Sequence, residues 1–201
     1  MLGLTEATFQ DTFDIPSDAN SSSNNVSGQG SITVTPGSRM PGVPLHNLNA
    51  SLNYEMTDEW TVGLSMVAHS DSYLRGNENN QHQSGVAQPR FVIVPGIGPT
   101  VVNRQPTTNP GKVDGYATFN FQTSYKLSKE WTATMMVNNI FDKEYFSAGR
   151  LGRNPFSPSI LGAVGPDGYN HNSGDWQSTN FIAPGAPRGV WFSLNWHFVP
   201  D

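Results

Sequence analysis

A short turn flanked by aromatic residues occurs twice in this chain. Residues 54–61 read YEMTDEWT, and residues 125–132 read YKLSKEWT. In each copy a polar turn joins two runs in which every second residue is apolar, so the sequence predicts two β-hairpins. Alternate residues of a strand share a face, which places the tyrosine and the tryptophan of each copy on the apolar face. Large aromatic rings at one level beside tight turns are typical of membrane β-barrels, where such rings lie among the lipid headgroups.

The opposite face of each predicted hairpin is polar but carries few charges. Small polar residues and amides occupy every second position before each turn: Asn47, Asn49, Ser51 and Asn53 before the first, and Thr118, Asn120, Gln122 and Ser124 before the second. A soluble antiparallel sheet with one buried face shows the same alternation. The position of the aromatic rings at one level beside the turns favours a membrane barrel, whose wall is apolar outside and polar inside.

The composition is consistent with a membrane barrel. Charged residues make up 13% of the chain, about half of the roughly 25% that is usual in soluble domains. No apolar run approaches the roughly 18 residues that a spanning helix needs. The net charge of -5 and the absence of a basic stripe argue against binding to nucleic acid. No signal peptide follows Met1, so we expect either that one was removed or that the chain starts inside a longer protein.

Long and short connections alternate along the chain. This order predicts an all-β fold, an antiparallel transmembrane β-barrel segment of about six long up-and-down strands with short periplasmic turns and long extracellular loops. The predicted strands are residues 4–13, 45–56, 60–69, 115–127, 131–141 and 189–198. The predicted extracellular loops are residues 14–44, 71–114 and 142–188.

The last predicted strand is apolar at every second residue back from Phe198. Such a row ending in an aromatic residue resembles the C-terminal strand that the outer-membrane barrel assembly machinery recognises, although three further residues follow here. An ordinary amphipathic edge strand is the alternative. The aromatic residues that we predict at the membrane interface are Tyr54, Trp60, Tyr125, Trp131, Trp196 and Phe198.

Several motifs resemble those of the TonB-dependent outer-membrane receptors. Residues 137–145, VNNIFDKEY, are very similar to the family's Val-x-Asn-Leu-Phe-Asp-Lys-x-Tyr element. Residues 37–48, GSRMPGVPLHNL, resemble its Pro-Gly-x-Pro-x-His entry into a strand. Residues 76–80, GNENN, resemble the Gly-Asp-Glu-x-Asn loop of iron-complex receptors, with Asn77 in place of the aspartate. Residues 184–188, PGAPR, which lead into the last predicted strand, also resemble a family element. The four elements occur in the same order as in the family.

The resemblance implies a barrel of about 22 strands around an N-terminal plug. It implies import of a scarce ligand, such as a ferric siderophore or a similar iron complex, across the outer membrane of a Gram-negative bacterium. We therefore expect residues 1–201 to be the C-terminal portion of such a barrel domain, with the plug absent and no transport by the chain alone. The expected partners are outer-membrane lipid and lipopolysaccharide, the barrel assembly machinery, an iron-complex ligand, and TonB only through the plug. No cofactor is expected.

Polar and aromatic residues of the predicted outer loops are the candidates for ligand contact. They are Arg75, Glu78, Asn80, Tyr169, His171 and Trp176. At the rim of the barrel we expect Asn138, Asp142 and Lys143 to form a turn and cap. Arg188 is expected to pair with a rim carboxylate or with a lipopolysaccharide phosphate, or to be solvated.

The sequence contains no catalytic or metal-binding pattern. His69 and His197 share the polar face but lie at opposite strand ends, about 25 Å apart, the height of the apolar band. His-Glu-x-x-His, Gly-x-Ser-x-Gly and phosphate-binding glycine motifs are absent. No enzyme is predicted. Two alternatives stay open: a small autonomous outer-membrane barrel with a structural or adhesive role, using residues 31–35 and 91–94 as extra strands, and a soluble β-sandwich that binds carbohydrate through exposed aromatics.

Overall fold

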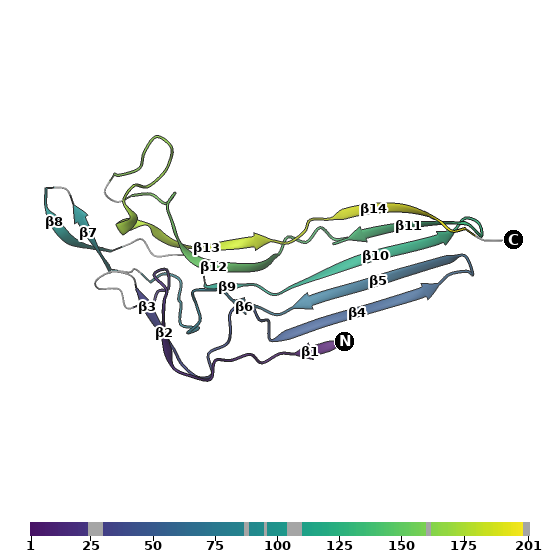
Figure 1. Cartoon of the computed structure of the whole chain (residues 1–201), viewed down its shortest axis with the longest axis horizontal. Coiled ribbons are helices and arrows are strands. Elements are labelled where there is room, and N and C mark those ends of the chain that lie inside the picture. Colours follow the sequence, from purple (N-terminus) through teal and green to yellow (C-terminus); the bar gives the residue numbers. More distant parts are fainter. Residues whose placement is uncertain (24–29, 87–88, 95, 104–109, 160–161, 199–201) are drawn as a thin grey trace.

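Six antiparallel strands form the main sheet. The computed structural model describes residues 1–23, 30–86, 89–94, 96–103, 110–159 and 162–198. The strand order is β1-β4-β5-β10-β11-β14 (Figure 1). These strands are β1 (Leu2–Leu4), β4 (His46–Glu55), β5 (Trp60–His69), β10 (Tyr116–Lys126), β11 (Trp131–Asn138) and β14 (Gly189–Trp196). All neighbours pair antiparallel, which confirms the predicted all-β antiparallel architecture.

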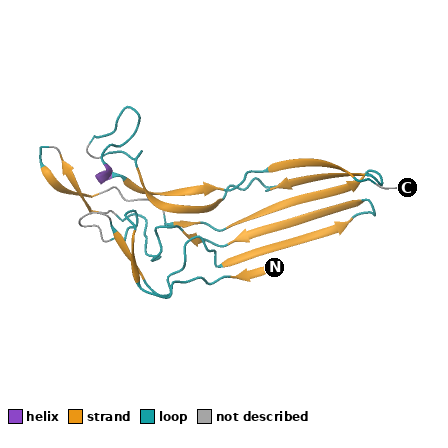
Figure 2. Cartoon of the chain, viewed as in Figure 1, coloured by secondary structure: helices purple, strands orange, loops and turns teal. Residues whose placement is uncertain are grey.

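Short two-stranded sheets occupy the long connections. The long strands lie at one end of the molecule, and the two-stranded sheets lie among the loops toward the other end (Figure 2). These sheets are β2 (Phe13–Pro16) with β3 (Ser31–Val34), β6 (Ser72–Tyr73) with β9 (Lys112–Val113), β7 (Pro89–Val94) with β8 (Gly98–Asn103), and β12 (Phe146–Asn154) with β13 (Gln177–Pro184). A short 3-10 helix, η1 (Ser173–Asp175), precedes β13. No helix in the described ranges is long and apolar enough to cross a membrane.

The predicted first strand is wrong over most of its length. Residues 4–13 were expected to cross, but only Leu2–Leu4 pair with β4. The backbone of residues 7–9 instead bonds to residues 37–40, with Phe9 N–H donating to Ser38 O at 2.9 Å. A longer β1 would run beside Pro44, which has no backbone N–H to donate to a sheet.

The strands proposed as extra barrel strands do form, but outside the main sheet. Residues 31–34 pair with β2, and residues 89–94 pair with β8. They do not extend the six-stranded sheet, so the arrangement that an autonomous barrel would need is absent from the described part of the chain. The same ranges hold one large sheet and four two-stranded sheets, which is not the pair of packed sheets that defines a sandwich.

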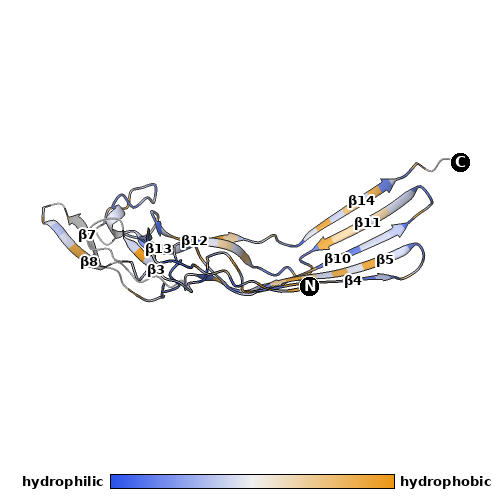
Figure 3. Cartoon of the chain, turned by 60° about the horizontal axis from the view of Figure 1, so that its bottom comes forward, coloured by the Kyte–Doolittle hydropathy of each residue, from blue (hydrophilic) through white to orange (hydrophobic). Residues whose placement is uncertain are grey.

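One face of the main sheet is apolar and uncovered. The register aligns Leu52, Leu64, Phe121, Val137 and Val190 in a row across five strands. Leu52 is 68% exposed and Val190 is 52% exposed, so protein does not cover this row. A soluble sheet buries such a face, because large contiguous apolar patches are rare on soluble monomers. The uncovered face therefore indicates contact with lipid. Figure 3 shows hydrophobic and hydrophilic residues alternating along these strands.

The opposite face is polar, with exceptions. The next row across the sheet is Asn53, Gly63, Gln122, Met136 and Trp191. The first three members fit the predicted polar face, and the last two do not. The prediction of a polar inner face therefore holds best for β4, β5 and β10.

The two tight turns share one hydrogen-bonding scheme. Thr57 Oγ1 accepts hydrogen bonds from the backbone N–H groups of Glu59, at 3.2 Å, and Trp60, at 3.1 Å. Ser128 Oγ likewise accepts hydrogen bonds from the backbone N–H groups of Glu130, at 3.1 Å, and Trp131, at 3.2 Å. A hydroxyl that bonds to its own following backbone favours a turn. The repeated turn in the sequence is thus a repeated local structure.

The predicted interface aromatics lie on one face at the turn end of the sheet. Trp60 pairs with Tyr125, and Trp131 pairs with Trp196. Tyr54 pairs with Val62 and so shares the face of Trp60. Strand parity and register therefore agree with the sequence on the position of all five rings. Their contact with lipid headgroups stays a prediction, as does that of Phe198.

Candidate ligand site in the loop region

A small apolar cluster holds the loop region together. Its members are Ala19, Leu74, Val113 and Leu151, all buried. They come from four segments that are far apart in the sequence. Beside them Lys112 Nζ lies 3.0 Å from Asp71 Oδ2, and this hydrogen bond raises the pKa of the lysine above its ordinary value.

Buried amides fix two of the loops against each other. Asn20 Nδ2 donates to Gly76 O at 2.8 Å and to Asn79 Oδ1 at 3.1 Å. His82 N–H donates to Asn77 Oδ1 at 3.0 Å. Buried polar groups that find partners make a structure rigid and specific. The family-like loop at residues 76–80 is thus a structural anchor for residues 17–22.

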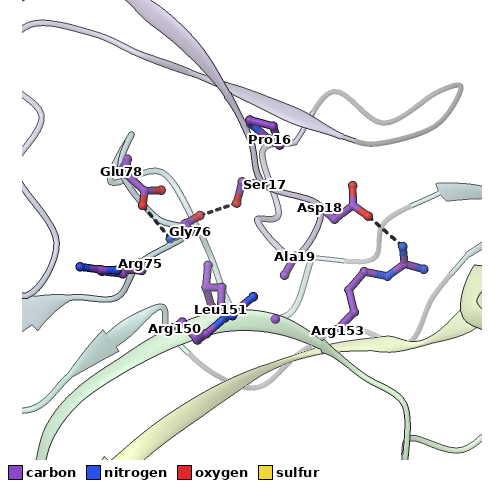
Figure 4. A pocket seen from close by; sticks show the side chains of 11 residues that line it. Pro16, Ser17, Asp18, Ala19, Arg75, Gly76, Glu78, Arg150, Leu151 and Arg153 are labelled. Carbon is purple, nitrogen blue, oxygen red and sulfur yellow. Dashed lines mark hydrogen bonds and ion pairs between the residues drawn. The ribbon is translucent and has the colours of Figure 1, made fainter.

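A cavity of about 500 Å³ opens next to this anchor (Figure 4). Residues 16–19, 75–76, 78 and 150–153 contribute its walls. The charged residues that line it are Asp18, Arg75, Glu78, Arg150 and Arg153. Three guanidinium groups and two carboxylates give the lining an excess of positive charge.

One carboxylate of the cavity forms an ion pair, whereas the other, Glu78, bonds through one oxygen to the backbone and has a second oxygen, Oε2, buried without a hydrogen-bond partner. Asp18 Oδ2 accepts from Arg153 Nη1 at 2.8 Å, and both side chains are largely covered. Glu78 Oε1 accepts from Gly76 N–H at 2.9 Å. Arg75 and Arg150 are exposed, and within the described ranges neither forms an ion pair with a protein carboxylate. These two arginines are therefore the cationic groups open to a ligand.

Asn80, another predicted ligand contact, has a structural role. Its Oδ1 accepts from Arg39 N–H at 2.6 Å, and its Nδ2 donates to Arg39 O at 3.0 Å and to Asn77 O at 3.1 Å. Its backbone φ is 59°, a conformation that asparagine adopts more readily than most residues. Asn80 thus fastens the turn after Glu78 to the segment before β4, and it does not line the cavity.

Tyr169, His171 and Trp176 form a separate aromatic cluster. The Tyr169 ring lies 5.0 Å from the His171 ring and 5.9 Å from the Trp176 ring, measured between centroids. Trp176 Nε1 donates to Asn170 O at 2.7 Å. The Arg153 guanidinium lies 5.8 Å from the Trp176 ring, so this arginine connects the cluster to the cavity. The structure thus brings these three predicted residues together, but they do not line the cavity to which Arg75 and Glu78 contribute.

Sequence reasoning missed Asp18, Arg150 and Arg153. The only local signal is a pair of arginines three residues apart in RLGR, residues 150–153. Asp18 carries no signal of its own, because its partner Arg153 is 135 residues away in the chain. Within the described ranges no group of three histidine, aspartate or glutamate side chains could hold a metal ion.

The strand ends at the rim form the expected turn and cap, with a different central residue. Asn139, rather than Asn138, is buried, and it donates to Lys143 O at 2.9 Å and to Ala186 O at 3.1 Å. Arg188 N–H donates to Asp142 Oδ1 at 2.9 Å, and its guanidinium lies 3.8 Å from Asp142 Oδ2. The expected pairing of Arg188 with a rim carboxylate is therefore confirmed.

Comparison with known proteins identifies the family. The sequence model of the family described as "TonB dependent receptor-like, beta-barrel" matches residues 3–140. The chain belongs to the TonB-dependent receptor family. TonB-dependent receptors are outer-membrane proteins of Gram-negative bacteria, the location predicted from the sequence, and their barrels have the predicted fold class. The family consists of receptors and transporters, not enzymes. A search of the curated proteins found no match.

Several solved TonB-dependent receptors are similar to this chain. The ferric-catecholate import receptor Fiu from K12 E. coli, in its closed form, is 17% identical with a TM-score of 0.45, over 80% of this chain and 15% of that chain. The siderophore receptor PiuA from Acinetobacter baumannii is 15% identical with a TM-score of 0.47, and the match covers 80% of this chain and 15% of that chain. The ferric yersiniabactin uptake receptor FyuA from Yersinia pestis is 15% identical with a TM-score of 0.47, and the match covers 80% of this chain and 17% of that chain. This chain therefore spans less than a fifth of the length of each receptor.

Proposed function

We propose that this chain is the C-terminal part of the barrel wall of an outer-membrane transporter for a scarce ligand, a ferric siderophore or a similar iron complex. The observation that carries the proposal is the match of the family's barrel model to residues 3–140. The apolar, uncovered face of the six-stranded sheet supports it independently, because a barrel wall presents such a face to lipid.

Each part of the chain has a role in this proposal. The main sheet contributes to the wall the five long strands β4, β5, β10, β11 and β14, with the three residues of β1 at its edge, and its polar face lines the lumen. The loop region lies on the extracellular side, where Arg75 and Glu78 at the cavity and the aromatic cluster of Tyr169, His171 and Trp176 meet the ligand. The wall contacts outer-membrane lipid and lipopolysaccharide, and β14 is the strand bound by the barrel assembly machinery. TonB is expected to act through the plug of the whole receptor.

Growth under iron limitation tests the proposal. The gene that encodes these residues is deleted in its own bacterium, and growth is scored with a panel of ferric siderophores and other iron complexes as the sole iron source. The deletion is expected to abolish growth on at least one complex, because import of large iron complexes needs a dedicated receptor. A plasmid copy of the whole gene should restore it.

The 201-residue chain alone is the control. Expressed behind a signal peptide in the deletion strain, it is expected to restore no growth, since import requires a closed barrel and a plug. Unchanged growth of the deletion strain on every iron complex would contradict the proposed ligand class. Energy-dependent uptake restored by the 201 residues would contradict the proposed division between barrel and plug.

A further inference from the structure

We propose that a groove on the apolar face of the main sheet binds one phospholipid of the periplasmic leaflet, with an acyl chain in the groove and the headgroup at the turn end. The inference goes beyond the proposed function, which gives the wall only a general contact with lipid. It rests on that function in one respect, namely that the tight turns lie on the periplasmic side.

The groove lies over three neighbouring strands, β10, β11 and β14 (Figure 1), and has a volume of about 380 Å³. Its floor is Ala133, which the register places between Tyr125 and Leu194. Residues directly opposite on neighbouring strands have Cβ atoms about 4.5–5.5 Å apart. The single methyl group of Ala133 therefore leaves a hollow between two larger side chains. The next row toward the middle of the sheet continues the groove with Thr123, Met135 and Phe192.

The hydroxyl group that this face contributes to the groove is already bonded within the protein. Thr123 Oγ1 accepts from Trp60 Nε1 at 2.8 Å and donates to Thr61 O at 3.2 Å. Phe192 is 77% exposed, so its side of the groove is open to the surroundings. Because a polar group in such a groove would lose its hydrogen bonds to water without replacing them, the groove suits an apolar chain.

Hydrogen-bond donors without protein partners lie at the turn end of the groove. Trp131 and Trp196 pair with each other one row closer to the turn than Ala133. Within the described ranges neither indole N–H forms a hydrogen bond, and nor does the Tyr125 hydroxyl, whereas the indole of Trp60 is bonded to Thr123. Tryptophan and tyrosine in membrane proteins favour the headgroup level, where one end of the ring is apolar and the other wet.

The order of these groups matches the order of groups in a phospholipid. Ester and phosphate oxygens at the headgroup level accept hydrogen bonds from the free donors, and the acyl chain runs from there along the groove toward the middle of the bilayer. Lipopolysaccharide occupies the outer leaflet of the outer membrane and phospholipid the periplasmic leaflet. Since the groove lies beside the turns, its occupant is phospholipid.

Native mass spectrometry tests the inference on the receptor that the whole gene encodes, purified from outer membranes in a mild detergent. The wild-type receptor is expected to retain one phospholipid more per molecule than Ala133→Phe, because the new ring fills the groove. Ala50→Phe is the matched control. Ala50 lies on the same apolar face, in β4, and does not line the groove, so this variant should retain as much phospholipid as the wild type.

A second variant tests the headgroup contact without changing the shape of the groove. Trp131→Phe keeps an aromatic ring but removes the indole N–H. The affinity of the delipidated receptor for added phosphatidylethanolamine is expected to fall about fivefold, because one hydrogen bond to the headgroup is lost. Trp191→Phe, the same substitution on the polar face of β14, should leave this affinity unchanged.

Several outcomes would overturn the inference. They are no phospholipid retained by the wild type, equal retention by the wild type and Ala133→Phe, or an equal loss in Ala50→Phe. Lipopolysaccharide in place of phospholipid, or a dimer that Ala133→Phe dissociates, would identify a different occupant. Circular dichroism shows whether each variant is folded. If Ala133→Phe does not fold, an unchanged affinity in Trp131→Phe is the result that contradicts the inference.

This test and the growth test fail separately. Phospholipid retention that depends on Ala133, in a protein whose deletion affects growth on no iron complex, would refute the transport proposal alone. A growth defect without such retention would refute the lipid-binding groove alone.

Discussion

Arginine in place of Leu52 or Phe121 is expected to destabilise the folded chain in a bilayer by about 2 to 4 kcal/mol. Both residues lie in the middle of their strands, on the uncovered apolar face, and both pair with Leu64. If that face meets lipid, the new guanidinium must enter hydrocarbon. On a water-exposed surface the same change would usually alter stability by less than about 0.5 kcal/mol. Urea unfolding in phospholipid vesicles, followed by tryptophan fluorescence, measures the difference.

The opposite face supplies the control. Asn49→Arg and Gln122→Arg place the same side chain on the polar face, Gln122 next to Phe121 and Asn49 three residues nearer the loop end of its strand than Leu52, and both are expected to cost far less. Asn49 and Gln122 are exposed, so neither substitution needs space in a packed core. Equal losses of stability for the two pairs would remove the assignment of an outer and an inner face.

Asn139→Ala is expected to cost about 3 kcal/mol of unfolding free energy, because it removes three hydrogen bonds to part-buried backbone groups and strains a left-handed residue. Asn139 is 3% exposed and has a φ of 49°. Its side chain bonds to both the N–H and the C=O of Lys143, each at 2.9 Å, and to Ala186 O at 3.1 Å. These contacts connect the end of β11 to the segment that enters β14.

Two variants separate the causes of this loss. Asn139→Gly tolerates the positive φ but removes the side-chain hydrogen bonds, so it should recover only part of the stability. Asn138→Ala, one residue earlier on the polar face, should change the unfolding free energy by less than about 1 kcal/mol. Faster hydrogen exchange at the Lys143 amide is expected in both Asn139 variants. A cost for Asn138→Ala as large as that for Asn139→Ala would contradict this role.

The hairpins of the main sheet are predictable from sequence because their determinants are local. Thr57 and Ser128 each bond to backbone groups two and three residues ahead. Alternation then assigns a face to every residue of the adjoining strands. Trp60 and Tyr125 could therefore be placed on one face without knowing how their strands pair.

The first strand and the cavity are less predictable because their determinants are distant. Residues 7–9 alternate like a crossing strand, but their backbone partners are residues 37–40. Arg75 and Glu78 could be found because Arg75 precedes the family-like loop at residues 76–80 and Glu78 lies within it. Asp18 and Arg153 meet only after the loops fold around a common apolar cluster, and nothing near either residue in the sequence marks the pair.

Quenching of single tryptophans by brominated lipids tests most directly whether the apolar face is the lipid-facing wall of an outer-membrane barrel. The five tryptophans are Trp60, Trp131, Trp176, Trp191 and Trp196. Variants that retain one tryptophan each, with phenylalanine at the others, are reconstituted in vesicles brominated near the headgroup or deep in the acyl chain. Trp60, Trp131 and Trp196 are expected to be quenched strongly, and most by the shallow bromines. Trp191, on the polar face, and Trp176, in the loop region, are expected to be quenched weakly by both lipids. Quenching of Trp191 as strong as that of Trp196, or no quenching of Trp60 and Trp131, would contradict the assignment.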